Sequence, residues 1–443
     1  MRAVIATMSC LLMAGTALAA QDRSRSLSIY FIDTEGGQST LYVGPGGETL
    51  LVDTGNAGER DLSRIVETLR NAGVTKIDHM WSTHFHGDHI GSLLEVAKQF
   101  PVGHFYDHGS PHPQDRIIPQ QFMSAYEALS SGKRTIVKPG DKLKIPGLDI
   151  VTVASDGKVI TSNLPGGGTA NPACASTQPK DESNYFDPDN GASAGFLLTF
   201  GRFRTVNLGD LTWNGELELM CPTNRVGTVD LYLTSHHGLA LSGSPALVHG
   251  LQPRVAVMNN GTRKGGEAGT FTVLQDAVGL EDLWQLHWSY NALLENAPAR
   301  FIANIDEPAT IASQITAPAP AAMGPPPGGF GPPGARAGGP PGAGPGGPSA
   351  GGPAPGAGGP GAGGPGAGGP PPGAGGPGGP GGAGGFGPPG GGFGPPGGFG
   401  GPGGPGAGGH TPAYIIQVVA REDGSFTVTN TRNGFSKTYP PRR

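Results

Sequence analysis

The chain has 443 residues, of which 14% are charged, and its formal net charge at pH 7 is −5. Because basic residues are not in excess, the charge does not favour a nucleic-acid partner held through its phosphates. The chain has 81 glycines, and 45 of them fall in residues 324–409. The part of the chain that can fold around an apolar core is therefore much shorter than the whole.

The first residues are typical of an export signal. One basic residue, Arg2, precedes an apolar stretch that ends in Ala17, Leu18 and Ala19, the small-x-small pattern of a cleavage site. The apolar run is shorter than the ~20 residues that a membrane span needs. We therefore expect residues 1–19 to be a signal peptide and the mature protein to be periplasmic or secreted, with no membrane span.

Strands and helices alternate in the part that follows. Short apolar runs at residues 26–33, 39–44, 49–53 and 76–83 are typical of strands. Apolar residues at helical spacing predict a helix over residues 59–73. A second helix is predicted over 89–100, where Pro101 stops it.

Four metal-ligand residues lie between the last of these strands and the second helix, in "THFHGDH". His84 and His86 are two residues apart, so in an extended loop both side chains point the same way. Asp88 and His89 enter the first helical turn and point elsewhere. One loop can thus serve two neighbouring ions, and these ligand types suit Zn²⁺ first, with Mn or Fe as alternatives.

The second half contains further strand-like runs at residues 195–201, 203–210, 229–235 and 254–259, which indicates a layered α/β protein with a mixed sheet. His236 and His237 follow the run at 229–235, and successive strand residues face opposite sides. We therefore expect only one of them to ligate, without choosing between them. The other would bond the substrate or donate a proton.

Two cysteines, Cys174 and Cys221, remain after signal cleavage. In an exported protein we expect them to form a disulfide, with two free thiols as the alternative.

Residues 318–409 are rich in glycine, proline and alanine, and we expect a disordered insertion that acts as a flexible spacer, with a surface-binding tract as the alternative. Ordinary composition returns in residues 410–443. Two strand-like runs there flank Asp423-Gly424, a hairpin signal. Because a lone hairpin is marginally stable, we expect it to dock on the domain of residues 20–317.

"THFHGDH" resembles the H-x-H-x-D-H signature of the metallo-β-lactamase superfamily. "LLVDTG", "NLGDL" and "LTSHHG" resemble later blocks of the same superfamily, and their flanks resemble the soluble hydrolase domain of bacterial DNA-uptake (competence) membrane proteins and their exported relatives. The resemblance implies an αββα sandwich with two metal ions at one edge. It also implies hydrolysis by a metal-bound hydroxide.

The resemblance assigns roles to individual residues. Asp210 would bridge the two ions, Asp88 would ligate or orient the nucleophile as the catalytic residue, and Asp53 would fix the ring of a ligand histidine. The implied metal ligands are His84, His86, Asp88, His89, Asp210, His236 and His237.

One ligand of the wider superfamily has no obvious counterpart. A separate histidine usually precedes the bridging aspartate, but here His108 is the nearest candidate and lies early in the chain, where a surface or structural role is the alternative. Asn190 and Ser193 stand where the missing ligand is expected, and neither is a strong ligand. We therefore expect the first ion to be held weakly.

The loop "MNNGTRKGG" offers Asn260, Arg263 and Lys264 to an anionic group, with a polar turn as the alternative. The sequence thus favours an exported metallohydrolase acting on a phosphodiester or another anionic ester. The alternatives are a lactone or lactam hydrolase, and a non-catalytic surface protein with a Gly/Pro-rich interaction tract. The oligomeric state is left open.

Overall fold

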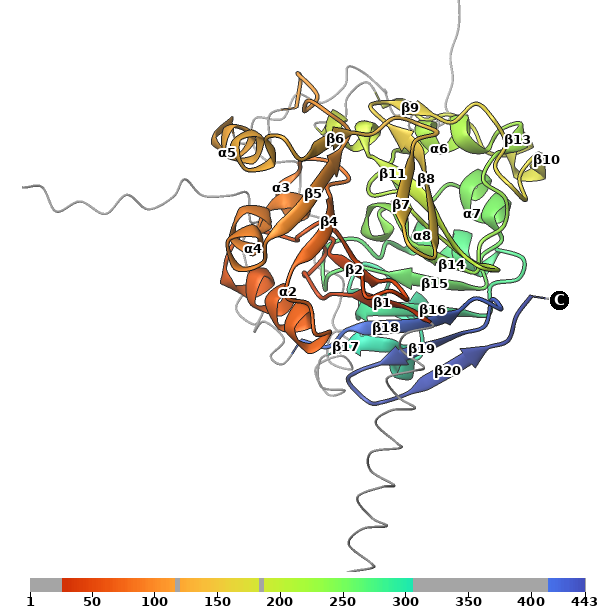
Figure 1. Cartoon of the computed structure of the whole chain (residues 1–443). Helices are drawn as coiled ribbons and strands as arrows, with labels where there is room; N and C mark the ends of the chain where they lie inside the picture. The colour runs from red at the N-terminus through yellow and green to blue at the C-terminus, as the bar shows by residue number, and fades with distance from the viewer. Residues whose placement is uncertain (1–25, 116–119, 183–186, 306–412, 443) are drawn as a thin grey trace, which may run out of the picture. The chain divides into compact units, whose positions relative to one another are not determined.

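The computed structural model describes residues 26–115, 120–182, 187–305 and 413–442 (Figure 1). These residues all belong to one unit of the chain. The predicted signal peptide and the predicted Gly/Pro-rich insertion lie outside the described residues. Within the described ranges, no helix combines the length and the apolar character that crossing a membrane would require.

Two large mixed sheets form the centre of the described unit. The first runs in the order β20-β19-β18-β1-β2-β3-β4-β5-β6, and β3 to β6 are parallel. Its strands are β1 (Ser26–Phe31), β2 (Thr40–Val43), β3 (Thr49–Val52), β4 (Ile77–Trp81), β5 (Val102–Asp107), β6 (Arg134–Ile136), β18 (Ile416–Arg421), β19 (Phe426–Asn430) and β20 (Ser436–Tyr439).

The second sheet runs in the order β17-β16-β15-β14-β12-β11-β8-β7, with β9 paired to β8, and β12 to β17 are parallel neighbours. Its strands are β7 (Lys142–Ile145), β8 (Leu148–Ser155), β9 (Lys158–Val159), β11 (Gly195–Phe200), β12 (Phe203–Asn207), β14 (Leu231–Leu233), β15 (Val255–Met258), β16 (Asp282–His287) and β17 (Ile302–Asn304). A small separate pair joins β10 (Thr169–Ala170) to β13 (Thr223–Asn224).

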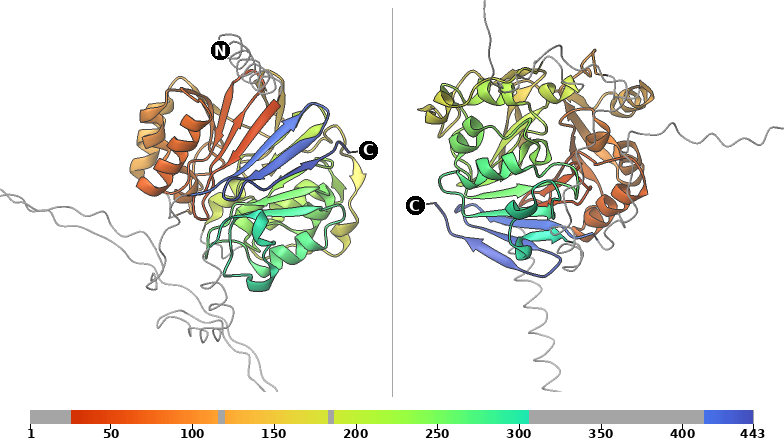
Figure 2. Two further views of the ribbon diagram at one scale, coloured as in Figure 1. Left: turned by 90° about the horizontal axis from the view of Figure 1, so that it is seen from below. Right: turned by 180° about the vertical axis from the view of Figure 1, so that it is seen from behind.

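Helices cover the outer face of each sheet (Figure 2). The α-helices are α2 (Glu59–Asn71), α3 (Gly87–Ile90), α4 (Leu93–Gln99), α5 (Gln120–Ser130), α6 (Trp213–Met220), α7 (Pro245–Leu251) and α8 (Ala268–Gln275). Short 3-10 helices are η1 (Pro172–Ala175), η2 (Pro188–Ala192), η3 (Ser235–Gly238), η4 (Leu293–Glu295) and η5 (Ala299–Phe301).

Three apolar layers hold together the two sheets and the two sets of helices that cover them. The central layer lies between the sheets, where Trp81 of the first sheet packs edge-on against Phe196 of the second at 5.1 Å. One outer layer packs α2, α4 and α5 on the first sheet, and the other packs α6, α7 and α8 on the second. The αββα sandwich predicted for the folded domain is confirmed.

The predicted helix over residues 89–100 is wrong in one respect, because it is broken into α3 and α4. At the break, the Gly91 N–H donates to the Gly55 carbonyl at 2.8 Å, and Ser92 Oγ donates to the Asn56 carbonyl at 2.6 Å. A Cβ at Gly91 would lie 2.1 Å from the Ala57 nitrogen. The break therefore follows from close packing against the loop after β3, which sequence periodicity does not reveal.

The C-terminal segment forms three strands instead of the predicted two. β18 pairs with β1 antiparallel over six residues, from Ser26 opposite Arg421 to Phe31 opposite Ile416, and β20 adds to β19. The side chain of Asn304, at the end of β17, exchanges two 2.9 Å hydrogen bonds with the backbone of Tyr414. The two described segments that flank residues 306–412 therefore meet at one point.

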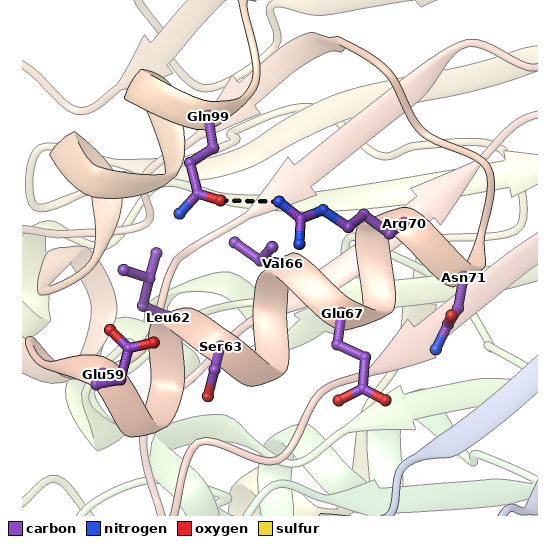
Figure 3. Close-up of a pocket in the computed structure, with 8 residues that line it drawn as sticks. All are labelled: Glu59, Leu62, Ser63, Val66, Glu67, Arg70, Asn71 and Gln99. Atoms are coloured by element: carbon purple, nitrogen blue, oxygen red, sulfur yellow. Dashed lines mark hydrogen bonds between the residues drawn. The ribbon is translucent and has the colours of Figure 1, made fainter.

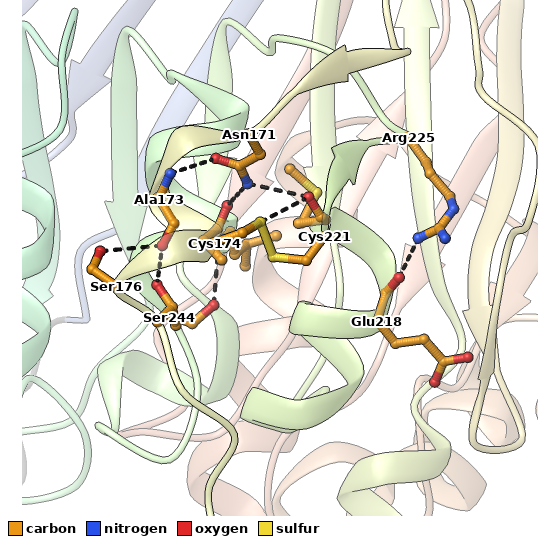
Figure 4. Close-up of a disulfide and its surroundings, with 12 residues drawn as sticks. Asn171, Ala173, Cys174, Ser176, Glu218, Cys221, Arg225 and Ser244 are labelled. Carbon is orange, nitrogen blue, oxygen red and sulfur yellow. Dashed lines mark hydrogen bonds between the residues drawn. A yellow bond between two sulfur atoms is a disulfide. The ribbon is translucent and has the colours of Figure 1, made fainter.

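A disulfide joins Cys174 in η1 to Cys221 at the end of α6, as predicted (Figure 4). Around it, the Asn171 side-chain amide donates to the carbonyls of Met220 and Ala246 at 3.2 and 2.8 Å. The segment before η2 is thus tied to α6, the helix that follows Asp210.

We expect no free thiols after signal cleavage and a less stable protein after reduction. The bond closes a loop with a sequence separation of 47 residues. A chain-entropy calculation gives about 4 kcal/mol of stabilisation for a loop of this size. Thiol titration in denaturant and urea unfolding of a Cys174→Ser, Cys221→Ser variant measure both quantities. Two titratable thiols per mature chain, or equal unfolding midpoints, would contradict the prediction.

Candidate metal centre

The candidate site lies at the edge of the sandwich where parallel strands of both sheets end. Asp53 follows β3, His84 follows β4, Asp210 follows β12 and His236 follows β14. The two halves are joined by the backbone, since the Ala194 N–H donates to the Thr83 carbonyl at 2.7 Å. Carboxyl ends of parallel strands face the same way, and therefore loops that are distant in sequence meet here.

Four imidazoles converge on one carboxylate oxygen, Oδ2 of Asp210. The Nε2 atoms lie 3.2 Å away for His89, 3.4 Å for His236 and His237, and 3.9 Å for His84. Gly209 precedes Asp210 with φ of 55°, and a Cβ there would lie 2.7 Å from that of Thr83. Glycine is therefore required where the Asp210 loop crosses the histidine loop.

His86 and Asp88 extend the cluster on either side. His86 Nδ1 lies 2.9 Å from His84 Nε2, so the two rings of the H-x-H pair do point the same way. Asp88 Oδ2 lies 3.3 Å from Nε2 of His89 and 3.1 Å from Nε2 of His237. Asp88, His89, Asp210 and His237 form one group of ligand atoms that could hold an ion.

The expectation that His236 and His237 face opposite sides is wrong. β14 ends at Leu233, and the two histidines lie in η3 with φ of 53° and 56°. Strand alternation therefore does not apply to them. Two successive left-handed residues turn both rings toward Asp210.

The donor set suits divalent ions such as Zn²⁺, which prefer imidazole and carboxylate ligands. Within the described part of the chain, Oδ1 of Asp210 is buried and accepts no hydrogen bond. The Nε2 atoms of His89 and His237 face each other at 3.2 Å, and both also face Oδ2 of Asp210. A buried acceptor without a donor and two opposed ring nitrogens are what a metal site requires.

The charges of the cluster depend on one another. Burial alone would raise the pKa of Asp210, but the imidazoles of His89, His237 and His236 hold that pKa well below its usual range. Burial lowers the pKa of His84 well below its usual range, and the neighbouring His89 and His86 lower it further. A charged carboxylate beside a neutral imidazole is the protonation state in which both can ligate.

Asp53 bonds the ring of His89, the position predicted for it. Its Oδ2 lies 2.8 Å from His89 Nδ1 and also accepts from Thr83 Oγ1 at 2.7 Å and from Gln38 Nε2 at 2.8 Å. Its Oδ1 accepts the Thr83 N–H at 2.8 Å. Asp53 thus fixes the ring so that Nε2 faces Asp210, which is the usual role of a carboxylate behind a ligand histidine.

Asp115 orients the ring of His86 in the same way, and sequence reasoning did not find this residue. Its Oδ2 lies 2.8 Å from His86 Nε2, which leaves Nδ1 facing His84. Asp115 sits in an irregular loop after β5, where neither spacing nor a motif marks it. His237 is contacted differently, because the side-chain nitrogen of Asn259, a hydrogen-bond donor, lies 3.2 Å from its Nδ1.

His108 lies outside the group of imidazoles around Asp210. Its Nε2 is 3.3 Å from Oδ2 of Asp189, and its ring packs on Phe85 at 4.8 Å. Asp189 in turn accepts the N–H groups of Phe85 and His112 at 2.9 and 2.7 Å. His108 therefore supports the histidine loop from behind instead of supplying the absent ligand.

Ser193 and Asn190 are both buried in the segment that precedes β11. Ser193 Oγ accepts the N–H of Asp210 at 3.2 Å, so Ser193 holds the Asp210 backbone. Oδ1 of Asn190 is buried and accepts no hydrogen bond from the described residues. The structure supports a positioning role for Ser193, whose own N–H donates to the Asn190 carbonyl at 3.1 Å.

The three residues predicted to bind a substrate anion lie in different surroundings. Lys264 forms an ion pair with Oδ2 of Asp88. Arg263 is exposed and lies over the ring of Tyr290 at 5.0 Å. Asn260 is buried and its Nδ2 donates to the carbonyls of Gly261 and His287. The structure therefore brings only Lys264 to the cluster, because the other two side chains are engaged elsewhere.

A second group of possible ligands, Asp33, Glu35 and His287, lies at the same edge. His287 Nε2 is 2.5 Å from Asp33 Oδ1, and the Arg64 guanidinium is 3.0 Å from Asp33 Oδ2 and 3.7 Å from Glu35. Burial would raise the pKa of Asp33, but His287 and Arg64 lower it. Arg64 already supplies the compensating positive charge, so this group is an ion-pair network.

A surface pocket on the outer helical layer contains none of the candidate metal ligands (Figure 3). It is lined by Glu59, Leu62, Ser63, Val66, Glu67, Arg70, Asn71 and Gln99. Arg70 bridges to Gln99 across it at 3.2 Å. It holds no group of histidines or convergent carboxylates, and we assign it no chemistry.

We expect Asp115→Asn and Asp53→Asn to weaken different ions. Each removes the carboxylate behind one ligand histidine, a change that costs about 10- to 100-fold in metal affinity. Asp115→Asn should weaken the ion at His84 and His86, and Asp53→Asn the ion at His89. Competition with a chromophoric chelator resolves the two binding steps. The prediction is wrong if both variants weaken the same step.

The sandwich and the histidine-carboxylate cluster define an αββα protein with a candidate metal centre. Residues 33–166 match the Metallo-beta-lactamase superfamily. This part of the chain is therefore similar to that superfamily.

Individual relatives match short parts of the chain. An atrochrysone carboxyl ACP thioesterase of Aspergillus terreus is 34% identical over 87 residues, which are 19% of this chain and 27% of that protein. The lactamase-like protein notP of Aspergillus sp. is 40% identical over 65 residues, 15% of this chain and 20% of that protein. The chain thus matches less than a third of the length of either relative.

Solved structures resemble the chain more distantly. The diiron beta-hydroxylase CmlA from Streptomyces venezuelae has a TM-score of 0.33 at 14% identity, with 53% of this chain and 45% of that chain covered. A diphosphatase from the PhnP family has a TM-score of 0.31 at 14% identity, with 53% and 87% covered.

Proposed function

We propose that the domain is a metal-dependent hydrolase of anionic esters, with phosphodiesters as the first substrate class to test. The observation that carries this proposal is the convergence of four imidazoles and Asp88 on Asp210. The resemblance of the sequence motifs to the hydrolase domain of DNA-uptake proteins supports the phosphodiester class.

The chain offers ligands for two divalent ions, Zn²⁺ first. They are His84, His86, Asp88, His89, Asp210, His236 and His237. Ions of this kind act as Lewis acids and lower the pKa of water to about 7. Asp210 would serve both ions, because its Oδ2 faces His84 of the H-x-H pair as well as His89 and His237.

Other contacts at the site would bind the substrate anion, orient the attacking water and hold the ligand rings in place. The side chain of Lys264 is 43% exposed, so its ammonium can contact both Asp88 and a substrate anion. Asp88 would either ligate an ion or orient the attacking water through its carboxylate. Asp53 and Asp115 keep the rings of His89 and His86 oriented.

Full-length protein loaded with Zn²⁺ should be assayed with a phosphodiester, a thioester, a lactone and a cephalosporin reporter. We expect hydrolysis of the phosphodiester, which lactam hydrolysis alone would contradict. The thioester is the second candidate, because the Aspergillus terreus relative is named a thioesterase. An absence of hydrolysis in metal-loaded protein would favour the non-catalytic alternative.

Lys264→Ala tests the anion site. It should lower kcat/KM on anionic esters by roughly 10- to 100-fold, which corresponds to the 1.5–3 kcal/mol of a hydrogen bond to a charged group. Activity on a neutral ester should change little. Arg263→Ala is the matched control, since that side chain packs on Tyr290. Equal losses on neutral and anionic esters would show that Lys264 has another role.

Export to the periplasm or the cell exterior is part of the same proposal. It is supported by the export signal in the sequence and by the Cys174–Cys221 disulfide, which is typical of oxidising compartments. N-terminal sequencing of protein recovered from each cell fraction tests it, with cleavage after Ala19 as the expected result.

A further inference from the structure

The turn that carries His236 and His237 is conformationally unfavourable. Both residues have a Cβ and adopt left-handed φ values of 53° and 56°. Such conformations persist only where surrounding contacts hold them. The contacts around this turn therefore decide whether both rings reach Asp210.

Glu216 is a buried acidic residue that holds the loop after this turn. It lies in α6 with 0% exposure, and its carboxylate accepts the N–H groups of Gly243 and Ser244 at 2.8 and 2.7 Å. Burial raises the pKa of Glu216 to about 7, and these donors oppose the rise. A buried carboxyl is unfavourable unless its hydrogen bonds are made, so its position implies a structural purpose.

Two connections lead from Glu216 to the histidine turn. The loop it holds includes Ser242, whose Oγ donates to the Leu211 carbonyl at 2.8 Å and lies 3.4 Å from Nδ1 of His236. Ser235, which precedes the turn, also bonds the Glu216 side chain, and its N–H donates to Tyr232 Oη at 3.0 Å. One connection reaches the His236 ring and the other reaches the backbone before it.

We propose that Glu216 is a positioning residue that holds the left-handed histidine turn in its metal-binding conformation. This inference rests on the proposed function, because it takes His236 and His237 to be ligands. Glu216 itself touches neither the ions nor the substrate. It ties the helix after Asp210 to the loop after His237, so the two parts of the site keep their spacing.

Titration of the metal-free full chain with Co²⁺ tests the inference, since the visible spectrum of Co²⁺ reports its ligands. Glu216→Ala should weaken at least one Co²⁺ by about tenfold or more and change the spectrum. Glu216→Gln keeps the size but offers one acceptor oxygen, so it should fall between wild type and Glu216→Ala. Glu218→Gln is the control, because Glu218 is exposed on the same helix and should not change binding.

The outcomes separate this inference from the proposed function. Wild-type protein that binds no Co²⁺ overturns the proposed function. Wild-type protein that binds two ions, with folded Glu216 variants that match its affinity and spectrum, overturns the inference alone. If neither Glu216 variant folds, Ser242→Ala decides, because it removes the contact to His236 without changing Glu216. Wild-type binding by that variant would then overturn the inference.

Discussion

Asp210→Asn should lose both divalent ions and lower ester hydrolysis by about 10³-fold or more, a loss of several kcal/mol of transition-state stabilisation. The reason is the position of Oδ2, which lies within 3.9 Å of Nε2 of four histidines. An uncharged amide is a poorer ligand and cannot balance two divalent charges. The change keeps the size of the side chain, so the sandwich should remain folded.

Elemental analysis of protein purified without chelator measures the metal content, and circular dichroism checks the fold. The control is Asp230→Asn, another buried aspartate in the second half of the chain, whose carboxylate accepts the Arg204 N–H at 3.0 Å and pairs with Arg442 at 3.1 Å. It should lose stability but keep both ions. Two ions in folded Asp210→Asn protein would show that Asp210 does not bridge.

A chain truncated at residue 409 should not fold. It lacks β18, β19 and β20, and β1 would become an open sheet edge. Five large side chains of these strands are buried in the central layer: Ile416, Val418, Phe426, Val428 and Tyr439. At 1.5–3 kcal/mol each, their burial contributes roughly 7–15 kcal/mol as an upper figure. That equals the whole stability of a typical domain, about 5–15 kcal/mol.

The contrasting variant replaces residues 318–409 by a short Gly-Ser loop and should fold and bind metal normally. Closure entropy varies only with the logarithm of loop length, so the shorter loop costs nothing. Thermal melts and metal content of the two variants give the comparison. A truncated chain that melts like the full-length protein would show that the three strands do not belong to the domain.

The sequence located the parts of the site that depend on spacing along the chain. Histidines two apart and a carboxylate in the first helical turn are local features: the rings of His84 and His86 face each other and Asp88 lies in α3, although His89 turns toward the same Asp210 oxygen as His84. Contacts between distant segments could not be predicted in this way. Asp115 bonds His86 across a loop with no regular pattern, and Glu216 acts through a loop 27 residues later.

Local backbone conformation was also predicted wrongly at two places. The strand-like run before His236 suggested alternation, but the backbone leaves the strand before the histidines and turns left-handed. Helical periodicity likewise continued through Gly91, where packing against the loop after β3 breaks the helix. In both places tertiary contacts overrode a local preference, and both places lie beside the metal centre.

The contact between Asn304 and Tyr414 has a consequence for a cleaved chain. A protease cut within 318–409 would place the paired strands β1 and β18 on different pieces of the polypeptide, while Asn304 and Tyr414 would still bond the two pieces. The shorter fragment would remain held by β1 through a six-residue register. We therefore expect the two pieces to copurify under native conditions and to part only in denaturant. A synthetic peptide of residues 413–443 could then restore the sandwich when added to the longer fragment.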